Sequence, residues 1–212
     1  MPTSAQASSE RLVYFTDAVA AIAITLLILP PVESVTEAPA AEGLEALIRE
    51  HAAEFGAFAF SFALIFRLWW AHHRIFRHIS TISTRLVLLS AVWTFAIVFL
   101  PVATAIITAY PPSAGTVALY GGTLILASGT MTALALTVYR HPEEFSEGRP
   151  PATRQEVLGN ATAFAAQVLA VIVGSIFAET VNFWAFLLMF LTGPIEQVIK
   201  RRWERDEAAV RV

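Results

Sequence analysis

The chain of 212 residues contains no cysteine, and few of its residues carry a charge. The missing thiols exclude disulfide bonds and thiolate metal sites. Only 15% of the residues are charged, against about 25% in ordinary soluble domains, and 56% are hydrophobic. The net charge is −3 and there is no basic tract of the kind that binds nucleic acid, which argues against a nucleic-acid partner. The composition is typical of a protein embedded in membrane lipid.

The hydrophobic residues lie in six long blocks separated by short polar segments. This pattern predicts an all-α, polytopic membrane protein with six transmembrane helices in a single domain, residues 1–212. We expect Pro30-Pro31 to end the first helix, because proline lacks an amide hydrogen and clashes with the preceding turn. Pro101 predicts a kink or an early end in the third. The predicted helices cover approximately residues 12–30, 44–71, 86–109, 116–139, 157–178 and 181–199.

Positive charge lies on one side of the predicted membrane topology. Connections 32–43, 110–115 and 179–180 contain no Lys or Arg, whereas connections 72–85 and 140–156 and the C-terminal tail are rich in them. Cytoplasmic loops carry the excess of Lys and Arg in membrane proteins. Six spans place both termini on the same side of the membrane, so the charge pattern predicts cytoplasmic N- and C-termini.

A secretory signal peptide is the competing interpretation of the N-terminal segment. Residues 38–40, Ala-Pro-Ala, resemble a cleavage site that follows an apolar stretch. Against this, Asp17 interrupts the apolar stretch, and cleavage would leave five spans and disturb the charge pattern. We therefore interpret the stretch as the first membrane span.

One face of the first predicted helix carries a regular stripe of side chains. The spacings of three and four residues place them along one side of the helix. One interpretation is that the stripe contacts lipid or another helix, which periodicity alone favours. The other is that it lines a pore and forms a hydrophobic constriction. The stripe comprises Arg11, Phe15, Ala18, Ile22, Leu26 and Leu29, and Thr25 borders it.

Asp17 lies near the N-terminal end of this helix, where a charge is costly to bury in a membrane. The helix dipole favours a negative charge there but is not sufficient to offset desolvation. A partner is expected at the same depth. Because the second helix runs in the opposite direction, the candidates are His72, His73 and, somewhat deeper, Arg67. The pair could be a purely structural clamp between helices or part of a functional site.

The paired histidines also raise the question of a metal enzyme. His72-His73 and His78 lie close together in the sequence, as in membrane diiron enzymes. Such a site needs more histidine or carboxylate ligands than a chain with five histidines in all offers. We therefore predict no metal site, no cofactor and no enzymatic activity.

Two motifs resemble the prokaryotic branch of the lysosomal potassium channel family (transmembrane protein 175). The first is Arg11-x3-Phe15-Thr16-Asp17, followed by Ala21-Ile22-x2-Thr25-Leu26. The family has serine where this chain has Thr16, which preserves the hydroxyl group. The second motif is Ser61-Phe62-x2-Ile65-x3-Trp69-x2-His72-His73-x2-Phe76.

The resemblance implies a homotetrameric channel in the plasma membrane of a prokaryote, surrounded by lipid and conducting monovalent cations, with potassium favoured. In the family, the first helices surround the ion path, and rings of large aliphatic side chains form the constriction. These rings correspond to Ile22, Leu26 and Leu29, with Thr25 beside them. The resemblance further implies a structural cluster that braces the pore helix. This cluster would comprise Arg11, Phe15, Thr16, Asp17, Trp69, His72 and His73.

Two other functions are compatible with a membrane bundle of this size. A proton- or cation-coupled secondary transporter would use Asp17 and the pair His72-His73. Transporters commonly show internal repeats and broken helices, and the sequence shows no internal repeat. A membrane scaffold would conduct no ions at all. A flux that saturates and requires a counter-ion gradient distinguishes the transporter from the channel.

Overall fold

The computed structural model describes residues 4–37, 43–146, 148 and 150–177, and the regular elements among them are all helices. The predicted sixth helix, 181–199, lies outside the described residues. The helices are α1 (Ser4–Leu26), α2 (Leu29–Glu37), α3 (Leu44–Glu50), α4 (Ala52–Phe76), α5 (Thr84–Ala109), α6 (Ala114–Arg140), α7 (Pro142–Phe145) and α8 (Arg154–Ile176).

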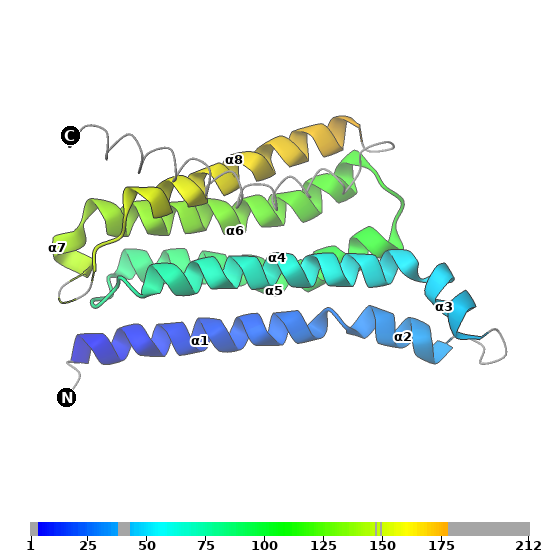
Figure 1. Ribbon diagram of the computed structural model, residues 1–212, viewed down its shortest axis with the longest axis horizontal. Helices are drawn as coiled ribbons and strands as arrows, with labels where there is room; N and C mark the ends of the chain where they lie inside the picture. Colours follow the sequence, from blue (N-terminus) through cyan, green and yellow to red (C-terminus); the bar gives the residue numbers. More distant parts are fainter. Residues whose placement is uncertain (1–3, 38–42, 147, 149, 178–212) are drawn as a thin grey trace, which may run out of the picture.

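Five of the described segments are long and apolar enough to cross a membrane. Figure 1 shows that their axes run roughly side by side along the longest dimension of the molecule. The predicted all-α, polytopic architecture is therefore confirmed for the described part of the chain. The five segments are Ser9–Glu37, Ala52–Phe76, Thr84–Ala109, Ala114–Arg140 and Arg154–Ile176.

Pro30 and Pro31 do not end the first span, and the prediction that they do is wrong. The helix breaks one turn earlier, after Leu26, and resumes as α2 with both prolines in its first turn. A proline nitrogen cannot donate to the carbonyl four residues before it, so Leu26 and Leu27 lose their usual donors. The first N–H groups of a helix have no intrahelical partner in any case, which is why prolines are tolerated there.

Two further boundaries differ from the sequence-based expectation. Pro101 lies inside α5, which continues to Ala109, so this proline does not end the helix early. The second predicted helix is divided at His51 into the short α3 and the long α4. The division falls in the mixed polar part of that segment, where the apolar pattern is weakest.

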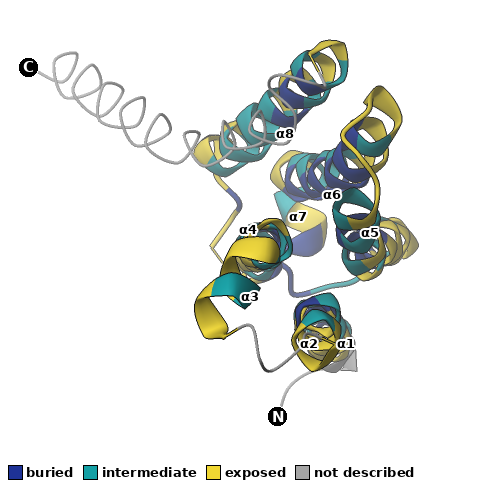
Figure 2. Ribbon diagram, turned by 90° about the vertical axis from the view of Figure 1, so that its right-hand side faces the viewer, coloured by how far each residue is buried: buried dark blue, intermediate teal, exposed yellow. Residues whose placement is uncertain are grey.

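The packing places α5 and α6 at the centre of the bundle. α6 packs against α5 and α8, while α1 packs against α4 and α5. Figure 2 shows α1 and α8 at opposite edges of the bundle, with buried residues concentrated on α5 and α6 between them. The first span is thus an edge helix with one side covered. Its buried hydrophobic side chains include Ala20, Ala23 and Leu27, and the largest fully buried side chains elsewhere include Trp93, Tyr120, Leu64 and Ile65.

A glycine allows α6 and α8 to approach closely. A methyl group at Gly129 would lie 3.0 Å from Cε2 of Phe164 on α8. Small residues at helix contacts are a common device in membrane bundles because they let backbones come together. Gly122, two turns earlier on α6, has open space around the corresponding position. The close contact with α8 is therefore present at Gly129 and absent at Gly122.

Candidate functional site

The stripe predicted on the first helix lies on the side of α1 that no other described element covers. Ile22 is 59% exposed, Leu26 43% and Leu29 49%. The opposite side of α1 carries the small buried residues that contact α4 and α5. An apolar row with no cover from its own chain requires lipid or another protein surface, since a water-exposed row of this kind is unfavourable. The structure therefore leaves this face available for contacts outside the chain.

Thr25 contributes a polar group to this exposed face. Its hydroxyl donates to the carbonyl oxygen of Ile22, at 2.8 Å. A hydroxyl oxygen that donates its single hydrogen keeps two lone pairs for other partners. The oxygen can thus accept from water or coordinate a cation at the level between Ile22 and Leu26.

The helix break follows directly after Leu26 and separates the stripe into two parts. Ile22 and Leu26 lie on α1, and Leu29 is the first residue of α2. The bonds across the break are Ile28 N–H to Thr25 O at 3.3 Å and Val32 N–H to Ile28 O at 3.0 Å. The position of Leu29 relative to Ile22 and Leu26 therefore depends on the geometry of this break.

After the break, polar side chains attach α2 to α4. The hydroxyl of Ser34 donates to the carboxylate of Glu54 on α4. The other oxygen of Glu54 lies 3.4 Å from Nδ1 of His51, at the junction of α3 and α4. These contacts fix the far end of the first span to the second.

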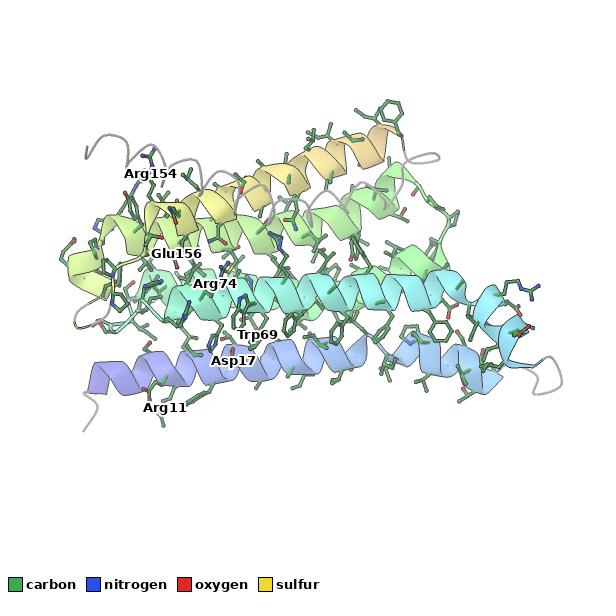
Figure 3. The ribbon with its side chains drawn as sticks, viewed as in Figure 1. Arg11, Asp17, Trp69, Arg74, Arg154 and Glu156 are labelled. Carbon is green, nitrogen blue, oxygen red and sulfur yellow. The ribbon has the colours of Figure 1, made fainter. Side chains whose placement is uncertain are left out.

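Asp17 faces α4, and two residues of that helix reach its carboxylate. The indole nitrogen of Trp69 donates to Oδ1 at 2.8 Å, and Nδ1 of His73 lies 3.8 Å from Oδ2. Trp69 and His73 are four residues apart and so lie on the same side of α4. Figure 3 shows Asp17 and Trp69 between the two helices. The structure thus supplies the partner that the depth of the carboxylate required.

Other members of the predicted cluster point elsewhere. Arg11 is exposed, and Figure 3 shows it on the side of α1 that faces away from α4. Phe15 is exposed on the uncovered face as well. Thr16 is buried, and its hydroxyl donates to carbonyl oxygens of the preceding turn, Leu12 at 3.1 Å and Val13 at 2.9 Å. Within one chain, the structure does not bring these three residues to Asp17.

His72 faces α5 rather than α1. Its ring is fully buried and stacks on Phe76 and Trp93, with centroids 4.4 Å and 4.1 Å away. Neither ring nitrogen has a hydrogen-bond partner among the described residues. The side chains of adjacent helical residues point in directions that differ by about 100°. His72 therefore contacts α5, whereas His73 faces Asp17 on α1.

Sequence reasoning missed a buried cluster of hydroxyl groups between α4, α5 and α6. The oxygens of Ser61 and Tyr120 are 3.0 Å apart, and Thr104 donates to Ser61 at 2.9 Å. The sequence does show isolated hydroxyl residues within the apolar spans, which indicates that they need buried partners. It does not show which helix faces meet, and so it does not identify those partners. Among the described residues, no group of three or more His, Cys, Asp or Glu side chains is placed to hold a metal ion.

The chain was compared with protein-family models and with curated protein sequences. Residues 11–101 match the sequence profile of the family described as endosomal/lysosomal potassium channel TMEM175, which confirms the resemblance found in the motifs. No curated protein sequence matches the chain.

The solved structures that share the fold include two potassium channels. The crystal structure of a lysosomal potassium-selective channel TMEM175 homolog from Chamaesiphon minutus is 24% identical, with a TM-score of 0.61, and the match covers 90% of this chain and 99% of that one. A variant of the potassium channel MtTMEM175, crystallised with a nanobody fusion protein, is 20% identical, with a TM-score of 0.53 and coverage of 92% and 93%.

Proposed function

We propose that this chain, which matches the TMEM175 family over residues 11–101 and has the fold of two TMEM175 channels, is a subunit of a potassium-favouring cation channel. The observation that carries the proposal is the uncovered stripe on α1. A single edge helix cannot enclose a path, so the conducting form requires several copies around one axis. We infer a homotetramer in which four α1–α2 segments surround the pore.

Conduction through such a pore is passive. Rings formed by Ile22, Leu26 and Leu29 offer no oxygen atoms to replace the water shell of an ion. The barrier therefore depends on the radius of the constriction and on whether it is wetted. Four Thr25 hydroxyls add a ring of oxygen atoms to this path, which supports an interaction with partly hydrated cations.

Asp17, Trp69 and His73 fix the pore helix to α4 in this proposal. Arg11 and Phe15 belong to the uncovered face, where they meet neighbouring subunits rather than Asp17 of their own chain. Thr16 is buried on the covered side of α1, and His72 packs α4 against α5 inside the subunit. The protein spans the plasma membrane of a prokaryote several times, with both termini in the cytoplasm, as the distribution of Lys and Arg supports.

The test combines oligomeric mass with ion flux. The full-length chain is purified in mild detergent, its mass is measured by native mass spectrometry, and it is reconstituted into liposomes with a potassium gradient. We expect four times the mass of one chain and a potassium flux that needs no counter-ion. A monomer removes the pore between α1 copies. Saturating flux coupled to a second ion identifies a transporter, and absence of flux identifies a scaffold.

A further inference from the structure

The connection between α4 and α5 links three other elements through consecutive residues. His78 contacts Pro150 and Glu156, at the start of α8. The carbonyl oxygen of Ile79 accepts a hydrogen bond from Ser9 of α1 at 3.1 Å. Both the backbone N–H and the hydroxyl of Ser80 donate to the carbonyl of Phe145 in α7, at 2.7 Å and 3.0 Å. Figure 1 shows the start of α1, α7 and this connection at the same end of the bundle.

Both ring nitrogens of His78 face hydrogen-bond acceptors. Nδ1 lies 2.7 Å from the carbonyl oxygen of Pro150, and Nε2 lies 3.0 Å from Oε1 of Glu156. The other carboxylate oxygen of Glu156 accepts from the backbone N–H and the hydroxyl of Thr153, at 2.8 Å and 3.1 Å. Neutral imidazole has one N–H and one lone pair, whereas imidazolium has two N–H groups. Only the protonated ring therefore satisfies both contacts with an ionised Glu156.

The burial of His78 makes this requirement strict. The residue is only 8% exposed, so water cannot readily replace a lost partner. A buried polar atom left opposite another acceptor costs more than the hydrogen bond itself contributed. If the ring loses one proton, a nitrogen lone pair faces an oxygen lone pair at one of the two contacts. The contact with α8 is thus complete when the ring is protonated and is weakened as the pH rises and the ring becomes neutral.

We propose that His78, as an imidazolium cation, is a positioning residue for the pore helix. It fastens the start of α8 to the same three-residue segment that holds Ser9 of α1. The proposal rests on the proposed function only in taking α1 as the pore helix. Histidine is the side chain whose charge changes most readily between pH 5 and 8, so this attachment depends on pH at the end of the bundle where α1 begins.

Glu156 is the ionisable group that contacts the ring. The other ionisable side chains at this end of the described bundle, from each neighbouring element, are exposed to solvent, and solvent screens their effect on the ring. They are Glu10 on α1, Arg74 and Arg77 at the end of α4, Arg85 on α5, Arg140 on α6, His141 between α6 and α7, Glu143 and Glu144 on α7, and Arg154 on α8.

The protonation state is tested directly in the unmodified full-length chain. The protein is labelled with 15N-histidine, placed in lipid nanodiscs and studied by NMR between pH 5 and 9. His78→Gln identifies the His78 signals by their loss. We expect two protonated ring nitrogens at low pH and a change to one as the pH rises. A neutral ring throughout this range, with its hydrogen on Nδ1, overturns the proposal.

Hydrogen exchange tests the attachment of α8 and α1. After correction for intrinsic pH effects, the exchange of amides in residues 154–158 and 9–12 should rise about tenfold as the ring becomes neutral, the effect of losing one buried charged hydrogen bond. His78→Gln should exchange fast at every pH. Wild-type exchange that does not depend on pH contradicts the proposal.

His141→Gln is the matched control for this experiment. His141 lies at the same end, and its Nδ1 is 3.5 Å from Glu143, but both side chains are exposed and belong to the same short segment. We expect this variant to keep the pH dependence of the wild type. If it loses that dependence as His78→Gln does, the effect does not come from His78. Neither measurement requires ion conduction, so this proposal and the proposed function fail separately.

Discussion

The indole N–H of Trp69 on α4 donates a hydrogen bond to Oδ1 of Asp17 on α1, at 2.8 Å. The bond joins the helix with the uncovered stripe to its neighbour, and the carboxylate is only 29% exposed. Phenylalanine fills most of the space of the indole but cannot donate. We expect Trp69→Phe to lower the free energy of unfolding by about 1.5–3 kcal/mol, the range for a hydrogen bond to a charged group. Unfolding in mild detergent measures the change.

Trp70→Phe is the control for this substitution. Trp70 is the next residue on the same helix, but it is half exposed, and its ring lies beside the rings of Trp69 and His73. We expect a change within about 0.5 kcal/mol, as for most surface positions. Equal losses in the two variants would show that the aromatic contacts, and not the bond to Asp17, hold the helices together.

The position of Asp17 shows how far the sequence could predict this site. Its depth in the span required a partner at the same level of the antiparallel helix, and His73 is one of the residues expected there. The direction of each side chain around α4 was not available, because it depends on how the two helices pack. For that reason the sequence leaves His72 as a candidate partner of Asp17 beside His73, although its ring stacks on Trp93. The family resemblance includes Trp69 in the cluster that braces the first helix, but the sequence does not assign its N–H to Asp17.

The sequence likewise predicted the long helices of the fold but not how they pack against each other. Length and hydrophobicity located the long spans, since a membrane requires about 20 apolar residues per helix. The effect of Pro30 was placed one turn too late, because proline disturbs the carbonyl four residues before it rather than its own position. The pairing of Ser61 with Tyr120 required knowledge of which helix faces meet. Local patterns do not contain that information.

The close approach of α6 and α8 at Gly129 predicts that alanine at this position lowers the stability of the bundle. A methyl group there lies 3.0 Å from the ring of Phe164 and forces the ring or the helix to move. We expect Gly129→Ala to destabilise the bundle by about 1–3 kcal/mol, as for overpacking in a filled core. Gly122→Ala, with nothing within 4 Å of the added methyl group, should stabilise the helix or leave it unchanged. Thermal unfolding of both variants in the same detergent separates the two effects.

The hydroxyl cluster predicts that Tyr120→Phe destabilises the contact between α4 and α6. The variant removes the phenolic oxygen 3.0 Å from Ser61 and keeps the ring in the core. We expect a loss of about 1 kcal/mol. Ser61→Ala should cost more, because it also removes the acceptor of the Thr104 hydroxyl. The double variant should cost less than the sum, since both substitutions remove the bond between Ser61 and Tyr120. Tyr139→Phe, on the exposed part of α6, serves as the control and should leave the free energy of unfolding unchanged.

The break between α1 and α2 predicts that alanine at residues 30 and 31 makes the span more continuous. The two new N–H groups can donate to the carbonyls of Leu26 and Leu27. Because the chain has no native cysteine, cysteines introduced together at Tyr14 and Val35 can each carry one spin label, and both positions are exposed. We expect the distance between the labels to change toward that of a straight helix, about 1.5 Å per residue along the axis. An unchanged distance in the double variant would show that packing against α4, and not proline, sets the break.

The stripe on α1 predicts that Ile22→Asn raises conductance and weakens the preference for potassium. An amide in place of the aliphatic group favours water in the constriction, and lowering the barrier by about 1.4 kcal/mol raises the rate of passage about tenfold. Single-channel currents and reversal potentials in planar bilayers measure both quantities. Ile172→Asn is the matched control, because Ile172 on α8 is 51% exposed, close to the 59% of Ile22, but lies on the opposite edge of the bundle. Wild-type currents in the Ile22 variant would remove this residue from the constriction, and equal changes in both variants would point to a general effect on the bundle.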